Sequence, residues 1–120
     1  MSEWFLAASM DIDPLREETF NEIYDDEHVP EILTVPGVRS VSRLIRQDEL
    51  KISIGGRAEV IRFATEPRYT ALYELDSPGV LTSPAWSVAV EVGRWAAEVR
   101  PFTSNWRHVL WRQMSRRAAR

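Results

Sequence analysis

Hydrophobic and polar residues alternate most regularly over residues 68–76, where nearly every second side chain is apolar. This two-residue period is typical of a strand that buries one face. The mostly apolar residues 3–10, the mixed residues 38–46 and residues 103–114 predict three further strands.

Apolar side chains occur on both faces of these predicted strands. Tyr69, Ala71 and Tyr73 share one face of their strand, whereas Leu72 lies on the other. The last strand also carries large side chains on both faces: Trp106, His108, Leu110 and Met114 on one, Val109 and Trp111 on the other. An open sheet of this kind would expose a large apolar surface as a monomer, so the sequence predicts a homodimer.

Two proline-containing signals mark the starts of two helices. Asp13-Pro14 places an N-cap residue before a proline at the first helical position, and this helix is predicted to reach about residue 34, with a kink at Pro30. Ser83-Pro84 repeats the signal and predicts a second helix to about Val99. That helix is apolar or small around most of its circumference, apart from one polar stripe: Ser87, Glu91, Arg94 and Glu98.

The resulting order is strand, helix, strand, strand, helix, strand, which predicts an α+β, ferredoxin-like βαββαβ fold with an antiparallel four-stranded sheet. We expect residues 1–114 to form one domain and residues 115–120 to form a basic, flexible tail. Residues 47–66 fit least well, because their Gly55-Gly56 pair suits either a hairpin or a loop with a helical turn. A connection of about 20 residues is long for a compact domain, so we expect a mobile lid over a pocket.

The composition limits the class of protein. The chain has 120 residues, of which 44% are hydrophobic and 28% charged, as in an ordinary globular domain. No apolar run is long enough to span a membrane and no secretory signal pattern opens the chain, so we expect no membrane association and a cytoplasmic location. The absence of cysteine excludes disulfides and thiolate chemistry.

Charge is distributed unevenly, although the formal net charge is only -3. Residues 11–31 hold nine acids and one arginine, whereas the chain after Glu98 holds six arginines and no acid. A basic end can bind nucleic acid, but the overall balance is acidic and no nucleic-acid-binding motif is present. We therefore expect no nucleic-acid partner.

The two histidines are the candidates for proton transfer, because imidazole titrates near neutral pH. Phe20, Tyr24 and His28 are spaced by four residues, which places a phenol and an imidazole side by side on one helix face. His28 is either a general acid or base next to Tyr24, or a surface residue near a helix end. His108 lies mid-strand beside apolar residues, where a hydrogen-bonded core histidine is the usual outcome.

Other chemistry has less support. The two histidines lack any local metal-ligand spacing, so no metal site is predicted. The only glycine cluster, Gly55-Gly56-Arg57, lacks a nucleotide-binding pattern. Five tryptophans indicate either core packing or an aromatic pocket for a flat apolar ligand: Trp4, Trp86, Trp95, Trp106 and Trp111.

These residues resemble the dimeric α/β-barrel superfamily, and most closely its EthD-like branch. The resemblance rests on Tyr24-x-x-x-His28-x-Pro30 followed by Pro36-Gly37-Val38, on residues 67–75 as a third strand, and on Ser83-Pro84-Ala85-Trp86 as the start of the second helix. It covers nearly the whole chain except residues 47–66.

The resemblance implies a protomer whose sheet pairs with that of a second copy to close a barrel, with a small-molecule pocket between sheet and helices. Relatives include polyketide cyclases, cofactor-free monooxygenases, lactone isomerases and accessory degradation proteins. In several of them the histidine matching His28 lines the pocket. Haem-binding relatives also exist, so haem is the alternative to the expected absence of a cofactor.

The sequence therefore predicts a cofactor-independent isomerase, cyclase or lyase acting on a small aromatic or cyclic, oxygen-bearing metabolite. His28 would transfer the proton, and Tyr24 would orient it or bind a substrate oxygen. Tyr73, Trp86 and His108 would form the pocket wall. The alternatives are a cofactor-free monooxygenase, which requires O₂, and a non-catalytic ligand-binding or accessory degradation protein.

Overall fold

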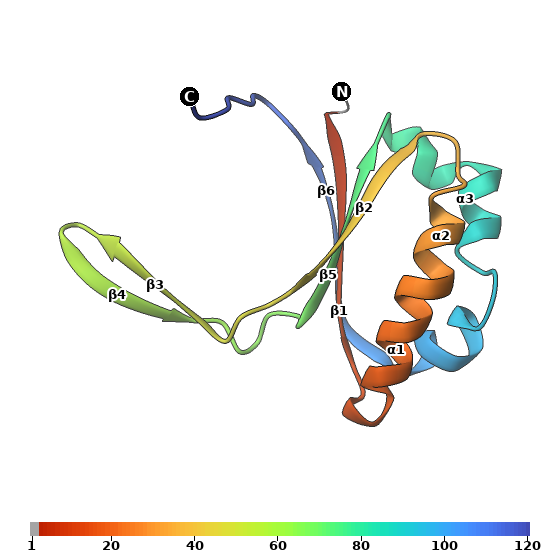
Figure 1. Cartoon of the computed structure of the whole chain (residues 1–120), viewed down its shortest axis with the longest axis horizontal. Helices are drawn as coiled ribbons and strands as arrows, with labels where there is room; N and C mark the ends of the chain where they lie inside the picture. The colour runs from red at the N-terminus through yellow and green to blue at the C-terminus, as the bar shows by residue number, and fades with distance from the viewer. Residues whose placement is uncertain (1–2) are drawn as a thin grey trace.

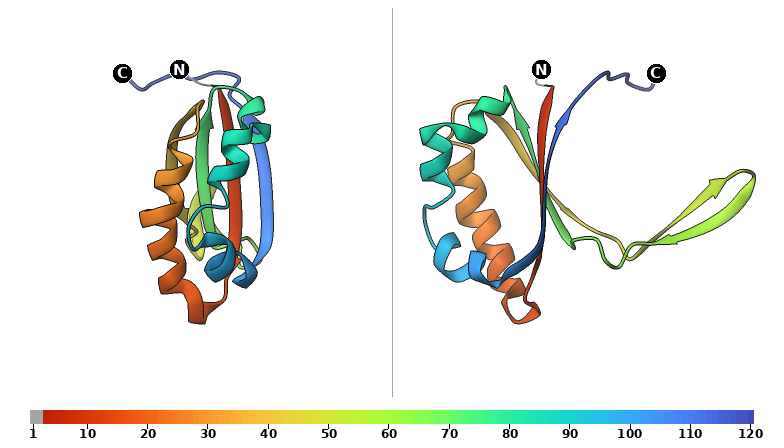
Figure 2. Two further views of the ribbon diagram at one scale, coloured as in Figure 1. Left: turned by 90° about the vertical axis from the view of Figure 1, so that its right-hand side faces the viewer. Right: turned by 180° about the vertical axis from the view of Figure 1, so that it is seen from behind.

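The computed structural model describes residues 3–120, and its centre is one antiparallel four-stranded sheet in the order β2-β5-β1-β6 (Figure 1). The strands are β1 (Trp4–Ile12), β2 (Val38–Ile45), β5 (Tyr69–Leu75) and β6 (Thr103–Arg112). All helical segments lie on one face of this sheet (Figure 2). This arrangement confirms the predicted ferredoxin-like fold.

The first helical run spans residues 14–32, close to the predicted extent, and consists of η1 (Pro14–Arg16), α1 (Glu17–Ile23), η2 (Tyr24–His28) and α2 (Val29–Ile32). Asp13 caps the run, because its carboxylate accepts a 3.0 Å hydrogen bond from the backbone N–H of Leu15. The segment η2 is a π-helical turn. Pro30 lacks the N–H that would bond back along the helix, which loosens this turn.

The second helical region is more broken than predicted. A turn, η3 (Pro78–Thr82), leads into α3 (Pro84–Ala89), and after a gap come η4 (Trp95–Val99) and η5 (Arg100–Phe102). The prediction of a continuous helix to Val99 was therefore wrong. The physical reason is Gly93, whose φ of 79° lies in the left-handed region that ends helices.

A close approach also keeps position 93 free of a side chain. A Cβ atom there would lie 2.8 Å from Oε1 of Glu27, whose carboxylate is bound by Arg94. The break thus brings η4 against η2 and buries Trp95, which is 6% exposed.

Residues 47–66 form the hairpin rather than the loop, with β3 (Glu49–Ile54) and β4 (Arg57–Arg62) paired as a separate two-stranded sheet. The two glycines at its turn have φ of 61° and 78°, as tight hairpin turns require. The hairpin projects from the side of the main sheet that faces away from the helices (Figure 1). Within one chain it therefore does not cover a pocket on the helical side.

The hydrophobic core lies between the sheet and the helical layer. Its fully buried side chains come from both layers: Phe20, Ile23, Ile32, Leu75 and Val99. The alternate residues of β5 are buried toward the helices, as their period predicts. Among residues 3–120, no helix is long and apolar enough to cross a membrane.

Candidate functional site

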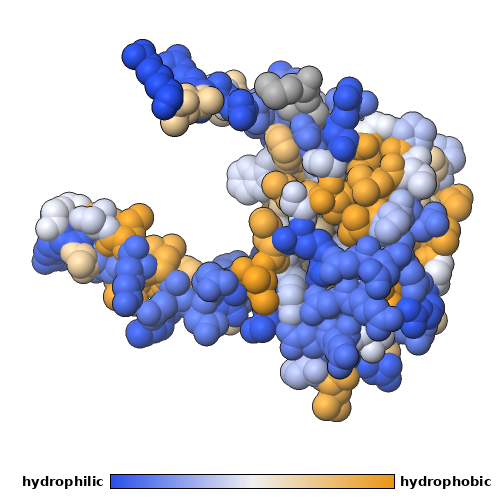
Figure 3. Space-filling view, viewed as in Figure 1, coloured by the Kyte–Doolittle hydropathy of each residue, from blue (hydrophilic) through white to orange (hydrophobic). Residues whose placement is uncertain are grey.

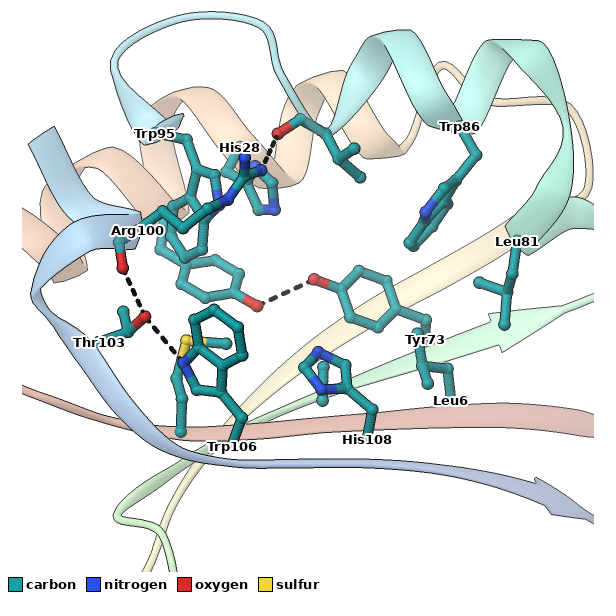
Figure 4. Close-up of a pocket in the computed structure, with 14 residues that line it drawn as sticks. Leu6, His28, Tyr73, Leu81, Trp86, Trp95, Arg100, Thr103, Trp106 and His108 are labelled. Atoms are coloured by element: carbon teal, nitrogen blue, oxygen red, sulfur yellow. Dashed lines mark hydrogen bonds between the residues drawn. The ribbon is translucent and has the colours of Figure 1, made fainter. Parts of the chain in front are cut away.

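A cavity of ≈ 390 Å³ lies between the helical layer and the helix-facing side of the sheet (Figure 4). This volume falls within the ~300–1,000 Å³ range of small-molecule sites, and the lining is mostly apolar and aromatic. The structure brings all five sequence-predicted site residues to its wall: Tyr24, His28, Tyr73, Trp86 and His108. Their functional roles stay predictions.

His28 is a buried residue and not the exposed helix-end histidine that was the alternative. It is only 5% exposed, and its ring stacks on Trp95 with a centroid distance of 4.1 Å and an interplanar angle of 15°. The ring of Tyr24 meets it edge-on at 5.2 Å. The π-helical turn thus keeps the phenol and the imidazole adjacent, as the sequence spacing predicted.

One nitrogen of His28 lacks a partner. Nδ1 is buried and has no hydrogen bond among the described residues. An unsatisfied buried polar atom costs free energy, and such atoms are few in folded proteins.

The environment keeps His28 neutral. Burial, together with the nearby Arg100 cation, lowers the pKa of His28 from 6.5 to about 4, and Glu91 acts in the opposite direction. At neutral pH the imidazole therefore has one N–H and one unprotonated nitrogen. It can accept a proton or a hydrogen bond, but it is not a cationic acid.

Tyr24 and Tyr73 form a buried pair of phenols next to His28. Their hydroxyl oxygens are 2.9 Å apart. Burial raises the pKa of Tyr24, and burial raises the pKa of Tyr73 well above its ordinary value, so both are uncharged. Because only one hydroxyl can donate within the pair, the other O–H is available to a ligand in the cavity.

We expect Tyr73→Phe to destabilise the protein by about 1–3 kcal/mol, because it leaves the buried Tyr24 hydroxyl without its partner. Urea denaturation of both single variants and of the double variant Tyr24→Phe/Tyr73→Phe measures the coupling between the two hydroxyls. The double variant should be only slightly less stable than either single variant, because the first substitution has already removed the hydrogen bond. Strict additivity of the two single effects would show that the hydroxyls do not stabilise each other.

The far wall of the cavity comes from β6 and η5. Trp106 Nε1 donates to Thr103 Oγ1 at 2.8 Å, and that hydroxyl donates to the carbonyl oxygen of Arg100 at 2.7 Å (Figure 4). Arg100 in turn donates to Glu91 at 2.8 Å. His108 stands beside Trp106 on this wall and is exposed, so the expectation of a core histidine was wrong for this chain.

Sequence reasoning missed most of the wall, including three large side chains: Trp95, Arg100 and Trp106. Trp95 had been placed on a continuous helix, and only the break at Gly93 turns it onto His28. Arg100 had been counted with the basic end of the chain, although its position between two turns directs it to the cavity. Trp106 shares the strand face of His108, which was the one available signal.

Comparisons with known proteins bear on the fold. No family model and no curated protein matches this sequence. One similar solved structure is that of a mutant of MhuD with two manganese protoporphyrin IX molecules bound per active site. It matches with a TM-score of 0.61 over 97% of this chain and 99% of that chain, at 10% sequence identity.

A match at this identity shows a shared fold and carries no function by itself. The chain thus has the ferredoxin-like α+β architecture of that protein. Membership of the dimeric α/β-barrel superfamily, and of its EthD-like branch, stays a prediction.

The described residues fit a porphyrin poorly. Arg100, the cation in the cavity wall, is already bound by Glu91. For a metal ion held by side chains alone, residues 3–120 contain no group of three or more suitable ligands, but a porphyrin iron does not need one. The ≈ 390 Å³ cavity suits a smaller planar ligand.

Proposed function

We propose that the protein is a cofactor-independent acid–base enzyme, an isomerase, cyclase or lyase, for a small aromatic or cyclic compound that bears oxygen. The cavity and the fold support a catalytic or ligand-binding role toward a small molecule. The single observation that carries the finer proposal is His28, a buried and neutral imidazole in the wall of an aromatic cavity.

The cavity wall favours a flat ligand with one polar edge. Trp86 and Trp106 offer ring faces and edges to an aromatic or alicyclic skeleton. The Tyr24–Tyr73 pair offers one O–H donor to a substrate oxygen. If negative charge develops on that oxygen during the reaction, a preformed donor in a dry cavity stabilises it more than water would.

His28 would take the proton. A base whose pKa is about 4 drives proton transfer only from a rather acidic group, such as a carbon between two carbonyls. Since Nδ1 is buried, the N–H would be at Nδ1 and the proton would move from the substrate to Nε2 of His28. The electron pair would move to the substrate oxygen beside the tyrosines. Return of the proton to another atom completes an isomerisation.

Exchange of substrate hydrogen with solvent tests this step. Cyclic 1,3-diketones and naphthols, incubated with the protein in D₂O and followed by NMR, should exchange hydrogen for deuterium faster than without protein. Quenching of tryptophan fluorescence reports binding separately. Binding without accelerated exchange would favour the non-catalytic carrier, and product formation only in the presence of O₂ would favour the monooxygenase. A stoichiometric Soret band on adding haem would overturn the cofactor-free proposal.

A further inference from the structure

The β3–β4 hairpin, residues 49–62 and here called the arm, has one mainly apolar and one mainly polar face. The strand register pairs Leu50 with Ile61 and Ile52 with Glu59, so their side chains share a face with Ile54. The four aliphatic side chains of that face are 39–52% exposed. Glu59 and Arg57, at the turn end, are the charged residues of that face. The opposite face carries Lys51, Ser53, Ala58, Val60 and an ion pair of 3.2 Å between Glu49 and Arg62.

The base of the arm is fixed to the main sheet. Asn105, at a φ of 52°, donates from its side-chain amide to the carboxylate of Asp11 at 3.0 Å and to the carbonyl of Thr65 at 3.1 Å. Arg46 donates to the carbonyl of Glu66 at 3.2 Å, and its guanidinium lies over the ring of Phe63. The arm therefore leaves the sheet in a defined direction.

The arm makes the single chain unusually extended. The radius of gyration is 16.4 Å, with extents of 50 × 38 × 22 Å. A compact chain of this length has a radius of gyration of about 14 Å. A two-stranded hairpin alone is at best marginally stable in water, so the arm needs a surface to pack against.

The apolar face of the arm continues into a second apolar surface, the side of the sheet away from the helices. Leu44, Val109 and Trp111 lie on this outer face and are 51%, 40% and 59% exposed. A groove lined by these residues and Phe63 runs along the base of the arm. Hydrophobic residues follow the inner side of the arm and its base, where they border a concavity of the molecule (Figure 3).

The area of these surfaces indicates what fills the concavity. The outer face exposes three large apolar side chains and the arm four, so each alone falls short of the ~800 Å² that each partner buries in a specific interface. A contact of that size needs both surfaces. A two-fold symmetric pair would use both surfaces twice, since an isologous interface repeats each contact.

We propose that the arm clasps a second copy of this chain and packs its apolar face on the outer sheet face of that copy. The inference builds on the expected homodimer and is independent of the chemistry proposed for His28. It assigns residues 47–66 to an intersubunit contact and not to a lid over the pocket of their own chain.

Two neighbouring substitutions test the arm with equal charge changes. Ile52→Glu places a carboxylate on the apolar face, and Ser53→Glu places one on the polar face. Sedimentation velocity over a concentration series should show a wild-type dimer at micromolar concentration. Ile52→Glu should raise the dimer dissociation constant about 100-fold, and Ser53→Glu by less than about threefold.

Deletion of the arm gives a second measurement. The Arg46 N–H donates to the Arg68 carbonyl at 2.8 Å, so a two-residue Asn-Gly turn can replace residues 47–67. This variant should be monomeric at the concentration where the wild type is a dimer. A monomeric wild type, equal weakening by both point variants, or a dimer unaffected by Ile52→Glu would each overturn the proposal.

Discussion

His28→Phe is expected to lower turnover, measured as hydrogen exchange of a bound substrate, by at least about 100-fold. Phenylalanine keeps a flat ring that can stack on Trp95 but carries no nitrogen, so the change removes the proton acceptor and little else. Ligand affinity, followed by tryptophan fluorescence, should change much less, because the aromatic walls supply most of the contact area. His28→Ala is a poorer test, because it would empty a buried site and destabilise the fold.

His108→Phe is the matched control on the opposite wall (Figure 4). It should leave turnover within a few-fold of the wild type if His28 acts alone. Loss of turnover equal to that of His28→Phe would show that the two histidines act together. A His28→Phe variant with full activity would end the catalytic interpretation, whatever its affinity for ligands.

The lowered pKa of His28 also predicts how the stability of the protein depends on pH. Since the pKa of His28 is about 4 in the folded chain and 6.5 when unfolded, the unfolded chain binds the additional proton between these values. The stability contributed by the neutral imidazole is complete above about pH 6.5 and falls by up to about 3 kcal/mol as the pH approaches 4. Urea denaturation at several pH values should show this decline for the wild type and a smaller one for His28→Phe.

The parts of the fold with a strong local period could be predicted from the sequence. The alternation in β5 and the Asp13-Pro14 cap are local signals, and the structure follows both. The spacing of Tyr24 and His28 also predicted their contact correctly, even though the turn between them is π-helical.

The rest depended on contacts between distant residues. Nothing around Gly93 in the sequence shows that Glu27 lies close to it. The break at Gly93 interrupts the second helix and turns Trp95 onto His28. The burial of His28 follows from this and so was missed. The direction of the arm depends likewise on Asn105, which lies about 40 residues away in sequence from the carbonyl it binds.

Phe20→Ala is expected to be the most destabilising substitution in the core, by about 3–5 kcal/mol. Phe20 is fully buried and joins the helical layer to the sheet. Its ring lies 5.4 Å from that of Tyr24, 5.0 Å from that of Tyr69 and 6.2 Å from that of Trp95. Alanine would leave a cavity that these large rings can fill only by moving away from the pocket.

The free energy of unfolding lost in Phe20→Ala is large compared with the ~5–15 kcal/mol that stabilises an ordinary domain. The melting temperature should therefore fall by on the order of 10 °C or more. Leu15→Ala is the control on the same helical run, because Leu15 is 92% exposed and should change stability by less than about 0.5 kcal/mol. Since Phe20 contacts both Tyr24 and Trp95, ligand affinity of Phe20→Ala should also fall at temperatures where the variant is still folded. Unchanged affinity and stability would show that the aromatic cluster does not hold the pocket wall in place.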